Sequence, residues 1–129
     1  MRILDTDHCI ALLRQKLDLR EHVTADEQLF ITAISVAELT HGAQRSQRRD
    51  DNLARLEVLF AALTVLSFDE SSARRFGLLK AELESKGKPL DDLDLQIASI
   101  ALENNLPLLT NNTNHFKRIH GLELQNWIK

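Results

Sequence analysis

The chain has 129 residues and a mass of 14.7 kDa, enough for one domain with a single hydrophobic core. With 43% hydrophobic and 27% charged residues, its composition is that of a globular protein rather than a disordered tail. The formal charge of −3 excludes the strongly basic type of nucleic-acid binder, so a phosphate-containing partner would require local arginines or a bound metal ion.

Cysteine content and hydropathy bear on location. Cys9 is the only cysteine, which excludes an internal disulfide and fits a reducing compartment. Asp5 and Asp7 interrupt the apolar start, which is not typical of a secretory signal. The longest charge-free apolar stretch, 58–68, is far short of the roughly 20 residues of a membrane span. We therefore expect a soluble, cytoplasmic protein without a membrane segment.

Short apolar strands alternate with helical patterns along the chain. In chain order we predict a strand at 3–4, a helix at 8–14, a strand at 29–32, a helix from 35 to 42 or 45, a helix around 53–63, a strand at 64–66, helices at 69–85 and 91–104, a strand at 108–110 and a candidate fifth strand at 122–127. This alternation predicts a parallel sheet with helices on both faces. In such sheets, functional groups collect at the carboxyl ends of the strands.

Two carboxylates follow the first predicted strand. Asp5 continues the strand directly, and a carboxylate buried there needs a partner. Asp7 is interpreted as the N-cap of the next helix, where its side chain would accept a backbone N–H. The two acids therefore have different predicted roles.

Glu38 follows the second predicted strand and has two interpretations. Residues Ser35 to Glu38 fit the S-x-x-E capping box, which would tie the glutamate to the start of its own helix. The same motif would also place Glu38 in the first helical turn, near the sheet edge that carries Asp5. Spacing leaves both interpretations open.

Asp94 lies near the start of the helix predicted at 91–104, for which Asp91 or Asp92 is the predicted cap. The third, fourth and seventh residues after Asp94 are all apolar: Ile97, Ala98 and Ala101. Asp94 therefore lies on the stripe that should face the sheet, where a charge calls for a cation. The alternative is a first-turn acid stabilised only by the helix dipole.

Acids from separate strand ends and helix starts would form an all-oxygen site, which suits Mg²⁺ or Mn²⁺. An ion with few protein ligands keeps water molecules and can activate one against a phosphodiester. Zinc is less favoured, because His8 and Cys9 are adjacent and the chain has no CxxC or HxxxH spacing; Cys9 is interpreted as a small core residue. The polar run in LLTNNTNHF (108–116) is either a turn or a holder of water or phosphate.

Four segments together resemble a known family: ILDTD, ISVAELTHGA, PLDDLDLQIASIAL and LLTNNTNHFKRIHGLELQNW. Their order and spacing are similar to those of PIN-domain ribonucleases, specifically the VapC-type toxins of bacterial toxin–antitoxin pairs. The resemblance implies a single PIN domain over 1–129. Its expected fold is a three-layer α/β arrangement in which helices flank a mostly parallel sheet of four to five strands.

The resemblance also implies a site and an activity. Its metal-binding and catalytic acids fall on Asp5, Glu38 and Asp94, and a fourth family position, often acidic, falls on Asn112. Further candidate polar residues are Thr110 and Asp7, which stands where many relatives have asparagine. The implied activity is Mg²⁺-dependent cleavage of single-stranded RNA, with Mn²⁺ as a possible substitute. The implied partners are an antitoxin that blocks the site and a second copy of the chain in a homodimer.

Alternatives remain at the sequence level. DTD after a strand suggests a haloacid-type phosphatase, but Cys9 stands where its DxDx[TV] motif needs Thr or Val. An inactive PIN-like partner-binding protein is the non-enzymatic alternative. The arginines at 45, 48 and 49 either contact RNA phosphates or form a solvated loop. The apolar helix face at 53, 56 and 60 is core, part of which could receive an antitoxin helix, and Phe116 and Trp127 are expected in the core.

Overall fold

The computed structural model describes residues 1–128 and contains a five-stranded sheet in which each neighbouring pair of strands is parallel. The strand order is β3-β2-β1-β4-β5. The strands are β1 (Arg2–Leu4), β2 (Leu29–Thr32), β3 (Thr64–Leu66), β4 (Leu108–Leu109) and β5 (Leu124–Gln125). The predicted α/β class, including the fifth strand, is confirmed.

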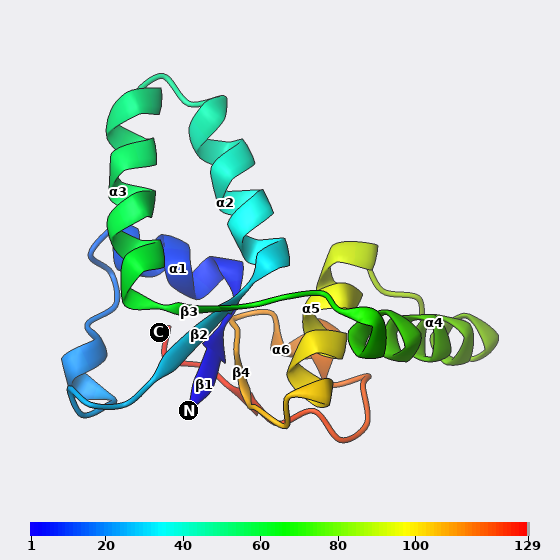
Figure 1. Cartoon of the computed structure of the whole chain (residues 1–129). Helices are drawn as coiled ribbons and strands as arrows, with labels where there is room; N and C mark the ends of the chain where they lie inside the picture. Colours follow the sequence, from blue (N-terminus) through cyan, green and yellow to red (C-terminus); the bar gives the residue numbers. More distant parts are fainter. Residues whose placement is uncertain (129) are drawn as a thin grey trace.

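Helices connect and cover these strands (Figure 1). They are α1 (Thr6–Leu13), α2 (Ala33–Gln44), α3 (Arg49–Ala62), α4 (Glu70–Ser85), α5 (Asp92–Glu103) and α6 (Thr113–Phe116), with a short 3₁₀ helix at Leu19–Glu21. In Figure 1, α2 and α3 lie side by side as an arm that rises from the sheet, while α4 and α5 form a second pair. Sequence patterns missed α6 and the 3₁₀ helix, which are each less than two turns long.

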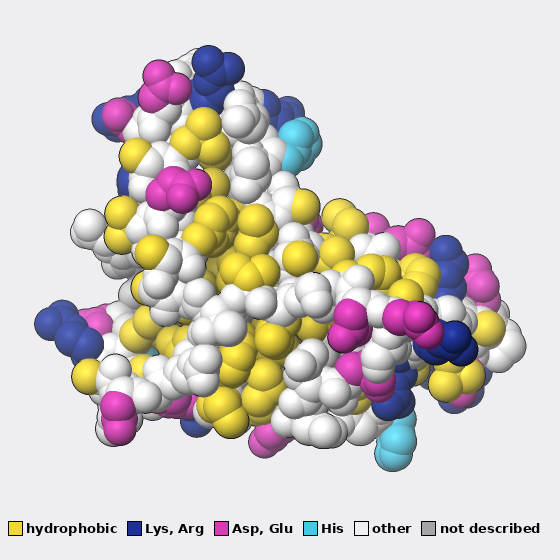
Figure 2. Space-filling view, viewed as in Figure 1, with side chains coloured by type: hydrophobic (Ala, Val, Ile, Leu, Met, Phe, Trp, Pro, Cys, Tyr) yellow, Lys and Arg dark blue, Asp and Glu magenta, His cyan; other side chains and the backbone are white. Residues whose placement is uncertain are grey.

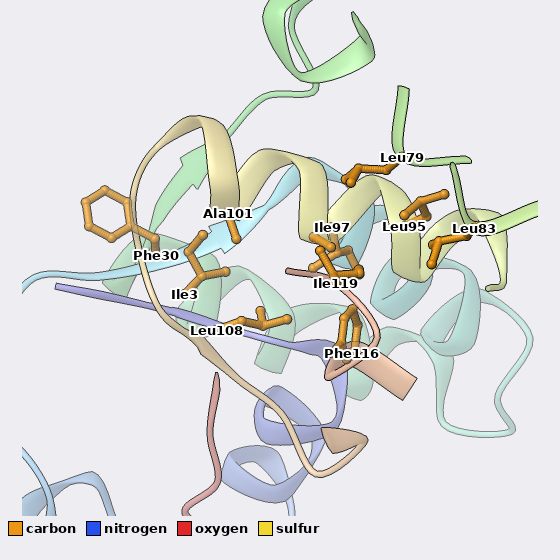
Figure 3. Packing of buried hydrophobic residues seen from close by; sticks show 11 residues of the cluster. Ile3, Phe30, Leu79, Leu83, Leu95, Ile97, Ala101, Leu108, Phe116 and Ile119 are labelled. Carbon is orange, nitrogen blue, oxygen red and sulfur yellow. The ribbon is translucent and has the colours of Figure 1, made fainter. Parts of the chain in front are cut away.

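The strands are short and hydrophobic because both faces of the sheet are covered. Adjacent residues of a strand point to opposite faces, so Ile3 enters one core and Leu4 the other. The first core joins the sheet to α4, α5 and α6 and includes Leu95, Ile97, Leu108 and Phe116 (Figure 3). The second joins it to α1, α2 and α3 and includes Cys9, Ile31, Leu39 and Leu56.

The order of the strands places a switch point at β1. The chain moves from β1 to β2 and β3 on one side, and returns to place β4 and β5 on the other. Leu4 pairs with Leu109, and the N–H of Asp5 donates to the carbonyl of Leu109 at 2.9 Å. The carboxyl end of β1 therefore lies in the crevice where open parallel sheets carry their ligands.

Helix caps correct two predictions. Asp5, not Asp7, is the N-cap of α1, and Asp7 lies in the first turn. Thr32 caps α2 through a bond from the Ser35 N–H, so the predicted capping box is absent and Glu38 lies in the second turn. Both helices begin directly at the end of a strand. The cap is therefore Asp5, the residue after β1, in one helix and Thr32, the last residue of β2, in the other.

The starts of α4 and α5 follow the prediction more closely. Asp91 caps α5, and Asp69 caps α4, which ends before Gly87 in the left-handed region at φ +66°. Phe116 is fully buried, whereas Trp127 is only partly buried against the second core. Among the residues described, none of the helices is both long and apolar enough to cross a membrane.

Candidate active site

Asp5, Asp7, Glu38 and Asp94 act on one another electrostatically at the carboxyl edge of the sheet. Burial, together with the charges of Asp7 and Asp94, raises the pKa of Asp5 to about 7. Burial also raises the pKa of Asp94, together with the charges of Asp91, Glu38 and Asp7. Carboxylates from β1, α1, α2 and α5 therefore share one region of negative potential.

Asp5 is fixed by hydrogen bonds on both of its oxygens. Oδ1 accepts the Thr6 N–H at 2.8 Å, and Oδ2 accepts the Thr110 hydroxyl at 2.7 Å. Thr110 is fully buried at the end of β4, and its Oγ1 accepts the N–H of Asn112 at 3.0 Å. The hydroxyl bond lowers the pKa of Asp5, but by less than burial raises it.

Glu38 is held by a hydroxyl from α1. Thr6 Oγ1 lies 2.9 Å from Glu38 Oε1 and 2.8 Å from Ser35 Oγ, which is buried. A carboxylate only accepts, so the single hydroxyl proton of Thr6 goes to Glu38 and Ser35 donates in turn to Thr6. Thr6 is a site residue that sequence reasoning missed; its place between Asp5 and Asp7 was the available signal.

Asp94 lies where predicted, at the start of a stripe whose later members Ile97, Ala98 and Ala101 are fully buried. Its side chain is 24% exposed, and its Oδ2 is 3.9 Å from Nδ1 of His115. Asn112 Nδ2 is 2.8 Å from the same His115 nitrogen. His115 was also missed: α6 is too short to show a helical pattern, although the i, i+3 spacing of Asn112 and His115 is visible in TNNTNH.

The donor chemistry fits a hard divalent cation. The converging side chains carry carboxylate oxygens, and a cation would offset both the burial and the mutual repulsion that raise the pKa values of Asp5 and Asp94. Within residues 1–128, however, no three His, Cys, Asp or Glu side chains are close enough to hold a metal ion together. Direct binding of an ion by three of these side chains would therefore require the carboxylates to move closer to one another.

Cys9 is not part of this donor set. It is fully buried, and burial together with the charges of Asp5 and Asp7 raises the pKa of its thiol to about 12. A thiol that stays protonated is a poor ligand, since metals bind the thiolate. The interpretation of Cys9 as a small core residue is confirmed.

The predicted arginine cluster lies at the opposite end of α2 from the acids. Arg45 caps the carboxyl end of α2, about 10 Å along the helix axis from Glu38 at 1.5 Å per residue. Arg48 and Arg49 are exposed and pair with Asp51 and Asp50. In Figure 2 charged side chains of both signs gather at the tip of the arm formed by α2 and α3. This mixture favours the solvated-loop interpretation.

Comparison with known proteins agrees with this geometry. The model of the PIN domain family matches residues 2–122. The chain is 34% identical over 127 residues to the tRNA(fMet)-specific endonuclease VapC of Shigella flexneri, covering 97% of this chain and 96% of the relative. It is also 34% identical over 131 residues to ribonuclease VapC2 of Rickettsia felis, covering 98% of both.

Solved structures show the same fold. DNA-bound VapBC from Salmonella typhimurium superposes with a TM-score of 0.91 at 34% identity, covering 98% of this chain and 99% of that one. VapBC2 from Rickettsia felis, bound to a DNA fragment from its promoter, gives 0.90 at 32% identity over 98% of both chains.

These matches, over nearly the whole chain, show that it belongs to the PIN-domain family. Within that family it is one of the VapC ribonucleases, the toxins of toxin–antitoxin pairs. PIN-domain VapC nucleases depend on a divalent metal ion. The family assignment sets aside the haloacid-type phosphatase alternative.

Proposed function

We propose that this chain cleaves single-stranded RNA by hydrolysis, using Mg²⁺ held by Asp5, Glu38 and Asp94, with Mn²⁺ as a substitute. The observation that carries the proposal is that a chain matching the PIN domain over residues 2–122 has Asp5 at the end of β1, Asp94 at the start of α5 and Glu38 on α2, with neighbouring carboxylates helping burial to raise the pKa of Asp5. A fold that gathers repelling acids at its switch point stabilises a cation there.

The roles follow from how each acid is held. Asp5 and Asp94 would hold the ion, one at a strand end and the other at a helix start. Glu38, oriented by Thr6, would help to hold the ion through water or would accept a proton from the attacking water. When bound, the metal lowers the pKa of its water and stabilises the charge that develops on the phosphate.

Asn112 has a supporting place in this proposal. Its amide nitrogen faces His115, and its backbone N–H bonds to Thr110. An amide carries no charge, so Asn112 adds no electrostatic attraction for the cation. We assign it to fixing the end of β4 and to orienting His115 beside Asp94.

We further propose that the cognate antitoxin seats a helix in a groove beside the acids. A cavity of about 310 Å³ lies between α1, α2 and α3, with apolar walls that include Ile10, Leu39 and Leu56. Thr6 and Glu38 line the same cavity, so a helix bound there would reach the site. The solved relatives named above are VapBC proteins, which supports such a partner.

Two further parts of the proposal rest on the family alone. We propose that the chain forms a homodimer, as PIN-domain toxins usually do. We also propose that it acts in the cytoplasm, where its RNA substrates are found.

The proposal is tested by mapping cleavage sites on total RNA with the purified chain and its Asp5→Asn variant side by side. Asparagine is as good an N-cap as aspartate, so the variant is expected to fold. We expect cuts that require Asp5, disappear in EDTA and return with Mg²⁺ or Mn²⁺. Full activity in EDTA contradicts the metal site, and identical behaviour of the folded variant, or no Asp5-dependent cuts, favours the inactive partner-binding alternative.

A further inference from the structure

His8 is a fully buried histidine on α1, and both of its ring nitrogens have partners. The backbone N–H of Trp127 donates to Nε2 at 3.1 Å, so Nε2 carries no proton. The proton of the neutral ring is therefore on Nδ1, which donates to Oδ1 of Asp7 at 2.8 Å. The tautomer of His8 is set by the C-terminal segment.

Asp7 connects His8 to the loop that follows β4. Its Oδ2 accepts the N–H of Asn111 at 2.9 Å and lies 3.3 Å from Thr110 Oγ1. The hydroxyl proton of Thr110 goes instead to Asp5, at the shorter distance of 2.7 Å. One chain of hydrogen bonds thus runs from Trp127 through His8 and Asp7 to the loop whose Thr110 holds the Asp5 carboxylate.

Trp127, where this series of hydrogen bonds begins, is itself fixed by two contacts of its ring. The Trp127 ring stacks on His22 with centroids 4.6 Å apart and planes 7° apart. The guanidinium of Arg2 lies 5.2 Å from the centre of the same ring. The contacts of the Trp127 ring with His22 and Arg2 therefore fix this residue and keep its backbone N–H directed at His8.

We propose that His8 and Asp7 are positioning residues for the metal site, and that Asp7 is not itself a ligand. The pair fixes residues 110–112 and, through Thr110, the orientation of the Asp5 carboxylate. This inference rests on the proposed function above. Residues that hydrogen-bond to metal ligands and orient them influence the affinity for the metal. Losing one such residue typically lowers metal affinity about 10- to 100-fold.

Two substitutions of His8 separate positioning from packing. In His8→Asn the amide nitrogen is near the place of Nδ1 and can donate to Asp7. In His8→Gln the longer amide reaches the place of Nε2 and serves Trp127 instead. Both variants place a polar amide in the same buried space, so they are matched controls for stability.

The experiment measures the dissociation constant of Mn²⁺ by titration calorimetry on the full chain, with amide hydrogen exchange of Asn111 in the metal-free protein. We expect His8→Asn to stay close to wild type in both. We expect His8→Gln to raise the Mn²⁺ dissociation constant about 10- to 100-fold and to accelerate exchange at Asn111, at a thermal unfolding midpoint similar to that of His8→Asn.

Equal Mn²⁺ affinities for the two variants overturn the inference, because a structural role alone would affect only the unfolding midpoint. Wild-type protein that binds no Mn²⁺ would instead contradict the proposed function. In that case the exchange of Asn111 still decides whether His8 and Asp7 hold the loop.

Discussion

The acids of the site fall into two halves that are held very differently. Asp5 is 5% exposed, and Asp5 and Asp7 accept hydrogen bonds from Thr6, Thr110, Asn111 and His8. Asp94 and Glu38 lie on α5 and α2 with fewer partners. We call Asp5 and Asp7 the buried half, after Asp5, since Asp7 itself is 34% exposed, and we call Asp94 and Glu38 the open half. Hydrogen bonds within the protein organise the buried half, whereas the open half has fewer such bonds and can adjust to a ligand.

This difference follows from the sheet. The buried half sits where β1 and β4 end side by side, so backbone register fixes its geometry. The open half is carried by helices that pack on opposite faces of the sheet, with α2 in one core and α5 in the other. Thr6 bonds to both Asp5 and Glu38, and an ion bound between the two halves would add a further link.

Removing the Thr110 hydroxyl should give the largest effect within the buried half. Thr110→Val keeps the shape but leaves Asp5 Oδ2 and the Asn112 N–H without a partner, at an expected cost of about 1–3 kcal/mol in the free energy of unfolding. We also expect weaker Mn²⁺ binding. Denaturant titration and calorimetry measure the two effects.

Thr110→Ser is the matched control. It loses a buried methyl group but keeps the hydroxyl, so it should retain Mn²⁺ affinity even if it loses some stability. Equal Mn²⁺ affinities for the valine and serine variants would show that the buried half is not held through Thr110.

The pH dependence of stability should be dominated by the same half. The folded pKa of Asp5, about 7, lies above its unfolded value near 3.8, so the native state binds the extra proton between these values. We expect the free energy of unfolding of the metal-free chain to fall as the pH rises from about 4 to about 7. The raised pKa of Asp94 acts in the same direction.

The Asp5→Asn variant should flatten this profile, because it has no carboxyl group to protonate at that position. Added Mn²⁺ should stabilise the wild-type chain more at pH 7 than at pH 5, because the ion competes with the proton. A wild-type stability that rises between pH 4 and 7 without metal would contradict the account. Denaturant titrations across pH measure it.

The smallest effect on stability is expected in the open half. Glu38→Gln keeps an oxygen that can accept from Thr6, so we expect the free energy of unfolding to change by less than about 0.5 kcal/mol. Mn²⁺ affinity should fall nonetheless, since a charge is lost. A large loss of stability would mean that Glu38, like Asp5, is organised by the fold.

The sequence predicted the strand ends and the starts of α4 and α5 well, but it predicted the starts of α1 and α2 poorly. Asp5, Glu38 and Asp94 could be predicted to lie near one edge of the sheet because apolar strands and the buried stripe of α5 are visible in the pattern of residues; their role as metal ligands stays a prediction. The caps at Asp7 and Ser35 were wrong because a cap depends on how soon the chain turns after a strand. The spacing of residues does not show where the chain turns into a helix, and an S-x-x-E pattern does not by itself determine which residue is the cap.

Contacts between distant segments were beyond the reach of sequence reasoning. The bond from Trp127 to His8 spans 119 positions, and the bond from Thr110 to Asp5 spans 105. Both depend on β4 and the C-terminal segment lying beside β1. The pattern of residues does not reveal the strand order β3-β2-β1-β4-β5, which is known only from the folded structure.

The most direct test of the central claim is the RNA cleavage rate of Asp94→Asn against wild type in Mg²⁺, with unfolding midpoints measured alongside. We expect a folded variant whose cleavage rate falls by more than about 100-fold, beyond the usual cost of losing a group that only supports a metal ligand. A folded Asp94→Asn protein that cleaves RNA at the wild-type rate would contradict the assignment of these acids to the metal site.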